Sequence, residues 1–175
     1  MKKIFLDCGA WTGISVDYFR KHHKGFEIHS FEPLFENLVE LEKRDTIIHP
    51  VAVWIRNRDS VRFFTGATES GTLNPEKRTG GLSPDKYILV QTIDIVEFIK
   101  DNFKKTDYII MKLNVEGAEY DIIPYMKNRG VLDWVNEWFI QWHWDKIGYT
   151  KGHHKAVSEM TEWKPWDIME HKKFN

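Results

Sequence analysis

The chain has 175 residues, with 25 basic and 26 acidic side chains and a formal net charge of −1. This near balance gives no bulk electrostatic reason to expect a nucleic acid or an anionic membrane as a partner. The single cysteine, Cys8, excludes an internal disulfide, and no apolar run approaches the ~20 residues of a membrane span. Because no signal peptide precedes the first predicted strand, we expect a cytoplasmic protein.

The length favours a single domain over residues 1–175. Within it, the motifs described below fall between about residues 3 and 145, and an aromatic-rich tail covers residues 146–175.

The first predicted element is a buried strand, Ile4–Leu6, which leads into a glycine turn and then a helix. Gly9 and Gly13 allow this turn to fold tightly against a ligand. The turn opens with Asp7, whose carboxylate would repel a pyrophosphate and attract an ammonium or sulfonium group. The pattern favours a cofactor turn, with a plain strand–turn–helix junction as the alternative.

The second predicted strand, Glu27–Phe31, ends in Glu32 and Pro33. Because Pro33 cannot continue a central ladder, Glu32 is expected at the carboxyl end of the strand, where open α/β sheets bind ligands. Glu32 follows Gly13 by 19 residues, which is close to the spacing of an acid that binds a ribose. Its carboxylate can accept two hydrogen bonds from the ribose hydroxyls. The alternative is a charge at the N-terminus of the next helix.

The chain then contains three β-branched, apolar segments. Thr46–His49 is predicted to be a third strand. Val51–Ile55 and Val61–Thr65 flank a turn at residues 57–60, and this arrangement predicts a β-hairpin.

Residues 66–86 combine glycine, proline, serine and threonine without periodicity. Such a stretch inside a compact domain predicts a functional loop or lid, with a disordered insertion as the alternative. A strand, Tyr87–Thr92, and a helix, Ile93–Phe103 with Asp94 near its start, are predicted to follow.

Tyr108–Leu113 is the longest aliphatic strand candidate and is expected beside the first strand. It leads into Asn114, Glu116 and Glu119, so an amide and two carboxylates follow the carboxyl end of a central strand. This is where a reacting group would be held. For Glu116, the alternative is a carboxylate that stabilises a helix N-terminus.

The helix after Glu119 contains Pro124, which is tolerated if the first turn begins near residue 120 or 121. A fifth strand is predicted over Trp134–Trp144, with His143 on the same face as Glu137. His143 and Asp145 have a spacing that a metal pair or an oriented histidine base would use, but no further ligands accompany them. We therefore expect a hydrogen-bonded histidine and no metal.

Six of the eight tryptophans lie between residues 134 and 166. They predict either a stacking surface for a sugar or base, or a cover over an exposed part of the sheet. The chain ends about 30 residues after the fifth strand, so any further strands are expected to be reduced or rearranged, and a homodimer is another way to cover the sheet.

Several segments resemble the FkbM-type methyltransferases of the class I S-adenosylmethionine-dependent superfamily, in the same order along the chain. They are Asp7–Gly13 (similar to D-V-G-A-N-x-G), Phe31–Pro33 (F-E-P), Gln91–Asp94 (T-L-D), Lys112–Glu119 (K-I-D-V-E-G-A-E) and Glu137–His143 (the final strand). The resemblance implies an α/β fold with a doubly wound, mostly parallel, Rossmann-like sheet.

The resemblance also implies the roles of individual residues. S-adenosylmethionine would be held by Asp7, Gly9, Ala10, Gly13, Glu32, Pro33 and Asn114. Glu116 and Glu119 would lie on the acceptor side, and Glu116, Glu119, His143 and Asn114 are the catalytic candidates. The asparagine of the family motif D-V-G-A-N-x-G is replaced here by Trp11.

Asn114 replaces the family aspartate, which removes a negative charge and any role as a base. If that aspartate is an essential base, activity would be impaired; if it positions a group, asparagine would serve. The expected function is methyl transfer to a hydroxyl of a small-molecule or glycan-like acceptor. The alternatives are a non-catalytic S-adenosyl ligand-binding module and, disfavoured by Asp7, an NAD-dependent dehydrogenase.

Overall fold

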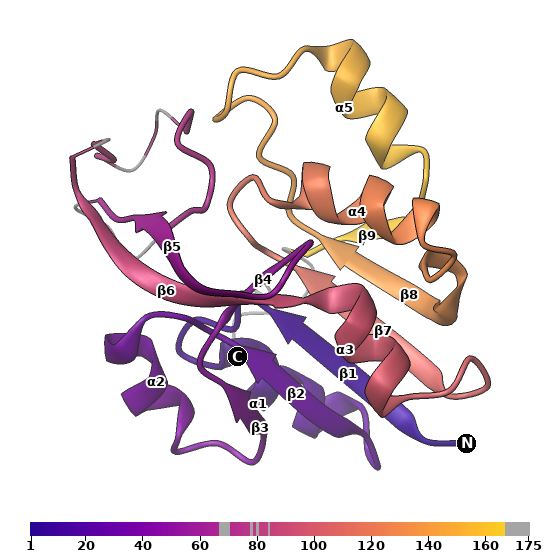
Figure 1. Cartoon of the computed structure of the whole chain (residues 1–175). Helices are drawn as coiled ribbons and strands as arrows, with labels where there is room; N and C mark the ends of the chain where they lie inside the picture. The colour runs from indigo at the N-terminus through magenta and orange to yellow at the C-terminus, as the bar shows by residue number, and fades with distance from the viewer. Residues whose placement is uncertain (67–70, 78, 80, 84, 167–175) are drawn as a thin grey trace.

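The computed structural model describes residues 1–66, 71–77, 79, 81–83 and 85–166. Among these residues, six parallel strands form the main sheet in the order β3-β2-β1-β7-β8-β9 (Figure 1). The order is typical of a doubly wound α/β fold, with β1 beside β7 at the centre. The strands are β1 (Lys3–Cys8), β2 (Glu27–Phe31), β3 (Ile47–His49), β7 (Tyr108–Leu113), β8 (Val135–Ile140) and β9 (Trp163–Pro165).

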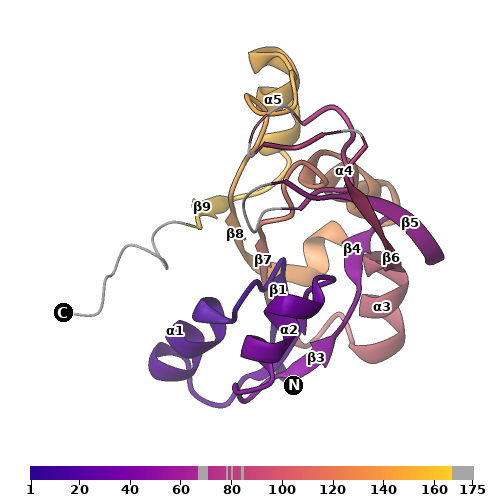
Figure 2. The same ribbon diagram turned by 90° about the vertical axis from the view of Figure 1, so that its left-hand side faces the viewer.

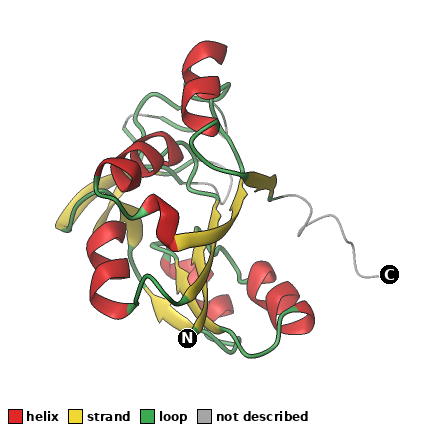
Figure 3. Ribbon diagram, turned by 90° about the vertical axis from the view of Figure 1, so that its right-hand side faces the viewer, coloured by secondary structure: helices red, strands yellow, loops and turns green. Residues whose placement is uncertain are grey.

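Helices cover both faces of this sheet (Figure 3). The helices α1 (Ile14–His22) and α2 (Phe35–Leu41) pack on one face, and α3 (Ile95–Asn102) and α4 (Glu119–Asn128) pack on the other. Successive side chains of a strand point to opposite faces, so Phe5 joins the first of these cores and Leu6 the second. Figure 2 shows α1 and α3 on opposite sides of β1. The predicted Rossmann-like fold is confirmed.

The C-terminal part of the described chain adds a short helix, α5 (Lys151–Ser158), and the edge strand β9. The hydroxyl of Tyr120 on α4 lies 2.8 Å from Nδ1 of His154 on α5. β9 pairs with β8 in parallel, so the described chain extends the sheet by one short strand beyond β8. The indole of Trp166, directly after β9, is buried against the core that contains Phe139.

The predicted β-hairpin is wrong. β4 (Ala52–Trp54) and β5 (Arg58–Phe64) do not pair with each other, because β6 (Tyr87–Asp94) lies between them in a separate three-stranded sheet. β6 is parallel to β4 and antiparallel to β5. The turn between β4 and β5 is bonded to β6, with Asn57 Oδ1 accepting from the N–H of Asp94 at 2.8 Å.

The predicted fifth strand is too long. Trp134 belongs to a short 3-10 helix, η1 (Leu132–Trp134), and β8 ends at Ile140. Beyond β8, the N–H of Gln141 still donates to the carbonyl of Leu113 on β7, but the chain then turns toward α4. His143 therefore lies in a loop and does not share a strand face with Glu137.

α4 forms after β7 as predicted, but it begins before residues 120 and 121, the starts that would make Pro124 tolerated. The helix begins at Glu119, which places Pro124 inside it and beyond the first turn. A proline there cannot donate a hydrogen bond to the carbonyl four residues earlier. The flanking Ile123 and Met126 are fully buried in the core, and this packing compensates for the missing bond.

Candidate functional site

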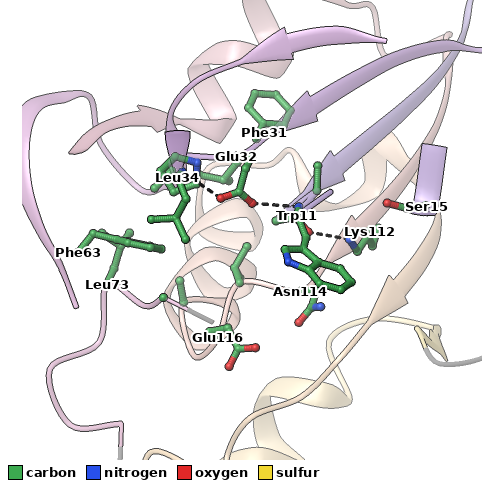
Figure 4. Close-up of a pocket in the computed structure, with 18 of the residues that line it drawn as sticks. Trp11, Ser15, Phe31, Glu32, Leu34, Phe63, Leu73, Lys112, Asn114 and Glu116 are labelled. Carbon is green, nitrogen blue, oxygen red and sulfur yellow. Dashed lines mark hydrogen bonds between the residues drawn. The ribbon is translucent and has the colours of Figure 1, made fainter. Parts of the chain in front are cut away.

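A cavity of about 310 Å³ lies at the carboxyl ends of β1, β2 and β7 (Figure 4). We call it the first cavity. Its volume is within the range of small-molecule and cofactor sites, and open α/β sheets bind ligands at this edge. Of the residues proposed from the sequence, Gly9, Ala10, Glu32, Pro33, Asn114 and Glu116 line it.

The β1–α1 turn is bonded to the end of β2. The N–H groups of Gly9 and Ala10 both donate to the carbonyl of Phe31, at 3.1 and 3.0 Å. Gly9 has a φ of +78°, and a Cβ built there would lie 2.1 Å from the carbonyl oxygen of Asn114. Glycine is therefore required where the first turn meets the chain that follows β7.

Glu32 follows β2 directly and is only 5% exposed. Its Oε2 accepts from the N–H of Trp11 at 2.9 Å, while Oε1 accepts from the N–H of Leu34 and from Asn37 Nδ2, at 3.0 and 3.2 Å. Burial raises the pKa of Glu32, and these donors offset part of the rise. Since each carboxylate oxygen accepts about two hydrogen bonds, Oε2 retains acceptor capacity for a ligand hydroxyl.

Asp7 is not among the residues that line the first cavity, and its predicted contact with a cofactor stays a prediction. It is fully buried within β1, where it accepts from Ser15 Oγ at 2.5 Å and pairs with Lys112 Nζ at 2.9 Å. The ammonium of Lys112 also donates to the carbonyl of Gly9 at 2.7 Å. Because Lys112 neutralises its charge, Asp7 anchors the turn and α1 and does not attract a cation by itself.

Gly13 is likewise a structural residue. It has a φ of +85° at the start of α1, and a Cβ there would lie 2.3 Å from Cδ of Arg44. Gly13 therefore allows α1 and α2 to approach. It does not line the first cavity, and its predicted contact with a cofactor stays a prediction.

Asn114 lines the first cavity just beyond β7. Its backbone N–H donates to the carbonyl of Cys8 at 3.0 Å, which fixes the residue beside the first turn. Its side-chain Oδ1 is buried and has no hydrogen-bond partner among the described residues. A buried carbonyl without a partner costs about 1–3 kcal/mol, so a ligand that donates to it would recover that energy.

Four charged residues of alternating sign form a continuous row next to the cavity: Lys77, Glu116, His143 and Glu119. The carboxylate of Glu116 pairs with the ammonium of Lys77 and lies 3.5 Å from His143 Nε2. Nδ1 of His143 lies 3.0 Å from Glu119 Oε1. Glu119 also accepts from the N–H of Gly117 at 2.9 Å, which ties the row to the β7–α4 turn.

The row determines the protonation of its members. Burial lowers the pKa of His143, but its hydrogen bonds and the charges of Glu116 and Glu119 outweigh this and raise the pKa to about 9. Burial raises the pKa of Glu116, but His143 and Lys77 outweigh it and lower the pKa to about 2. At neutral pH the imidazole is therefore protonated, and Glu116 is a weak base.

These properties bear on two of the predicted catalytic residues, whose roles stay predictions. His143 and Glu119 are fully buried and do not line the first cavity. A protonated imidazole cannot accept a proton, so the predicted role of His143 as a base requires that it first lose its own proton. The contacts of Glu119 hold His143 and the turn before α4. Of the two carboxylates predicted on the acceptor side, Glu116 faces the cavity; it does so with a φ of +52°.

The sequence did not reveal Lys77 or Lys112 as site residues. Lys112 had one signal, because a lysine inside an otherwise apolar strand is rarely buried without an ionic partner. Lys77 had none, since it lies in an aperiodic segment. Residues 71–77 of the predicted lid lie against the site: Gly71 and Leu73 line the first cavity and Thr72 is fully buried. The lid's remaining positions at 67–70, 78, 80 and 84 lie outside the described residues.

The described part of the chain contains neither a cluster of metal-ligating side chains nor a helix that could span a membrane. Within it, no group of three or more His, Cys, Asp and Glu side chains is arranged to hold a metal ion. None of its helices combines the length and apolar character needed to cross a membrane.

A family model of the methyltransferase FkbM domain matches residues 7–164. The chain belongs to the FkbM methyltransferase family. Searches of curated proteins and of solved structures return no match. The matched range of this FkbM domain contains both the first cavity's turns and the four-residue charged row, and the family implies a methyl-donor cofactor.

Proposed function

We propose that this FkbM domain binds S-adenosylmethionine in the first cavity and transfers its methyl group to a hydroxyl of a small-molecule or glycan-like acceptor. One observation carries the proposal. The cavity has the acceptor Glu32 at one place and the unpartnered Oδ1 of Asn114 at another, with an apolar wall beside them (Figure 4). These groups match the ribose, the ammonium and the adenine of the cofactor.

The adenosine half would be held by apolar side chains and Glu32. Leu34, Ala52, Val53, Phe63 and Leu73 line one part of the cavity. Such a wall suits the flat, weakly polar adenine ring. Glu32 Oε2, which accepts one hydrogen bond from Trp11, would accept another from a ribose hydroxyl.

The amino-acid half would be held near β1 and β7. Asn114 Oδ1 would accept from the ammonium group. The first residues of α1, Ile14 and Ser15, also line the cavity, and a helix N-terminus attracts an anion such as a carboxylate. In this proposal, each charged group of the cofactor's amino acid has a partner on the protein.

The cofactor, when bound, supplies a methyl group already activated by a sulfonium. The protein then has to hold an acceptor hydroxyl in line with it, and alignment of this kind can supply about 7–11 kcal/mol. Glu116 would accept a hydrogen bond from that hydroxyl and orient it. With a pKa of about 2, Glu116 aligns the hydroxyl and contributes little as a base, so the hydroxyl proton would pass to water as the oxygen–methyl bond forms and the sulfur–methyl bond breaks. His143 and Glu119 keep the Glu116 carboxylate in place.

The second candidate is a non-catalytic module that binds an S-adenosyl ligand. Asn114 in place of the family aspartate is the observation that favours it. A nicotinamide dehydrogenase loses its support because the chain belongs to a methyltransferase family.

Two measurements separate these functions. Thermal unfolding with S-adenosylhomocysteine should show a raised midpoint, because a ligand that binds only the folded state stabilises it, whereas NAD should have no effect. Transfer of a labelled methyl group from S-adenosylmethionine to an acceptor panel should follow. Binding without transfer would favour the non-catalytic module, and stabilisation by NAD alone would contradict both candidates.

A further inference from the structure

A second cavity, of about 320 Å³, lies beside the first and shares Leu73 and Ala118 with it. Unlike the wall of the proposed adenine site, most of its lining carries polar groups. The polar side chains come from β4, the 71–77 segment, α4 and the loop before α5: Trp54, Asn74, Glu76, Asp121 and Tyr149.

The two cavities meet at the turn between β7 and α4. A Cβ built on Gly117 would lie 3.5 Å from Cβ of Asn74, which lines the second cavity. Glu116, one residue earlier, lines the first, and its carbonyl accepts from Thr72 Oγ1 at 2.6 Å. A ligand in the second cavity is thus separated from the Glu116 side of the first by Leu73 and Ala118.

The second cavity presents both hydrogen-bond donors and acceptors. Asn74 Oδ1 accepts from the N–H of Glu76 at 2.8 Å, which leaves one acceptor position on this oxygen and the two N–H donors of the side-chain amide. Burial raises the pKa of Tyr149, and the charges of Asp121 and Glu76 raise it further, so its hydroxyl stays protonated. Asp121 and Glu76 contribute acceptor oxygens.

This mixture distinguishes between ligand classes. A cation would be attracted by Asp121 and Glu76, but the guanidinium of Arg56, 4.9 Å from the ring centroid of Trp54, offsets part of this attraction. A cation would also leave the donors of Asn74 and Tyr149 without partners. A hydroxyl both donates and accepts, so neighbouring hydroxyls match a wall that alternates carboxylate, amide and phenol. Trp54 and Tyr149 add aromatic surface for the ring that carries those hydroxyls.

We propose that the second cavity is the acceptor subsite and binds a polyhydroxylated ring, such as a sugar or cyclic polyol, with one hydroxyl directed past Leu73 toward Glu116. The assignment rests on the proposed function for its role in methyl transfer. The claim that a polyhydroxylated ring binds in the second cavity depends only on the residues that line this cavity.

Saturation-transfer NMR with a panel of methyl glycosides tests this claim about binding, with and without saturating S-adenosylhomocysteine. We expect saturation transfer from the protein to at least one glycoside, which shows that the glycoside binds. Asp121→Asn and Tyr149→Phe should each weaken that binding at least fivefold. Asp133→Asn, which changes an exposed aspartate outside the second cavity, is the matched control and should leave the affinity unchanged. Thermal unfolding of each variant confirms that it is folded. If one of the two site variants does not fold, the other still tests the proposal.

The outcomes separate this inference from the proposed function. Absence of transfer to every glycoside, equal binding by folded site variants and control, or a preference for spermidine over the glycosides would overturn the sugar assignment. Calorimetry with S-adenosylhomocysteine measures the affinity of the first cavity alone. Glycoside binding without S-adenosylhomocysteine binding would support the sugar site and contradict methyl transfer; the reverse result would overturn the sugar site only.

Discussion

Glu119 accepts two hydrogen bonds from His143, one from the backbone N–H at 2.8 Å and one from Nδ1 at 3.0 Å. Both residues are fully buried, so this pair stands behind the site and not within it. Through Nε2 of His143, it supports the carboxylate of Glu116 at the cavity wall. We conclude that Glu119 positions Glu116.

The pair predicts how stability depends on pH. The pKa of His143 is about 9 in the folded protein and ordinarily 6.5, so its stabilising effect is fully present below pH 6.5 and is lost as the pH rises through 9. The shift corresponds to a free energy on the order of 3 kcal/mol. Urea unfolding at pH 6, 7.5 and 9 should show the advantage of the wild type over His143→Gln shrinking across this range. A constant difference would contradict a protonated His143.

The ion pair between Lys77 and Glu116 predicts that the ammonium of Lys77 holds the 71–77 segment against the turn before α4. Lys77 is 4% exposed, and Lys77→Met keeps most of its apolar stem while removing the ammonium. Amide hydrogen exchange at residues 71–77 should accelerate, because the pair no longer ties this segment to the turn before α4. Lys155→Met, at an exposed surface pair, is the control. Equal exchange in both variants would mean that packing alone holds the segment.

Gly9 predicts a large difference between two glycine substitutions. Both Gly9 and Gly130 have positive φ, so alanine at either costs about 1–2 kcal/mol of backbone strain. Only at Gly9 would the new Cβ meet another backbone, the carbonyl of Asn114, whereas nothing lies within 4 Å of it at Gly130. In urea unfolding, Gly9→Ala should therefore lose at least about 2 kcal/mol more than Gly130→Ala. Similar losses would show that the first turn can shift to relieve the contact.

Asn114→Asp should keep or raise methyl-transfer activity, because it restores the family residue and preserves an acceptor oxygen in the cavity. Asn114→Leu removes that oxygen and should weaken S-adenosylhomocysteine binding about tenfold or more. Labelled methyl transfer and calorimetry measure the two effects. A large loss of turnover in Asn114→Asp would show that a second carboxylate near Glu116 is not tolerated.

Local pattern was sufficient to predict the edge of the sheet on which the site lies. Glu32, Asn114 and Glu116 each follow an apolar strand, and the carboxyl ends of parallel strands meet at one edge. The hairpin failed because β6 separates β4 from β5, and pairing with a strand more than 20 residues away leaves no periodic signal between neighbours.

The charge states of the site residues could not be predicted from the sequence, for a different reason. A histidine that lies between Glu116 and Glu119 is protonated, but nothing in the loop after β8 indicates that these two carboxylates surround it. The same holds for Asp7, whose carboxylate is neutralised by Lys112 on the neighbouring strand. Charge at a site depends on contacts between strands, and a motif contains only one side of each contact.

The central claim is that Glu32 binds the S-adenosyl ligand and Glu119 does not. The two glutamates are closely matched, since both are buried and each accepts three hydrogen bonds within the protein. Glu32→Gln and Glu119→Gln keep the shape of the side chain and remove the charge. They differ in that Glu32 lines the first cavity and Glu119 does not.

Calorimetry with S-adenosylhomocysteine on both variants, after thermal unfolding has confirmed that each is folded, is the most direct test. Replacing a charge-assisted hydrogen bond to the ribose by a neutral one should cost about 1–2 kcal/mol, so Glu32→Gln should weaken binding about fivefold to thirtyfold. Glu119→Gln should stay within about threefold of the wild type, because its contacts are internal. Equal losses of affinity, or a larger loss for Glu119→Gln, would contradict the account.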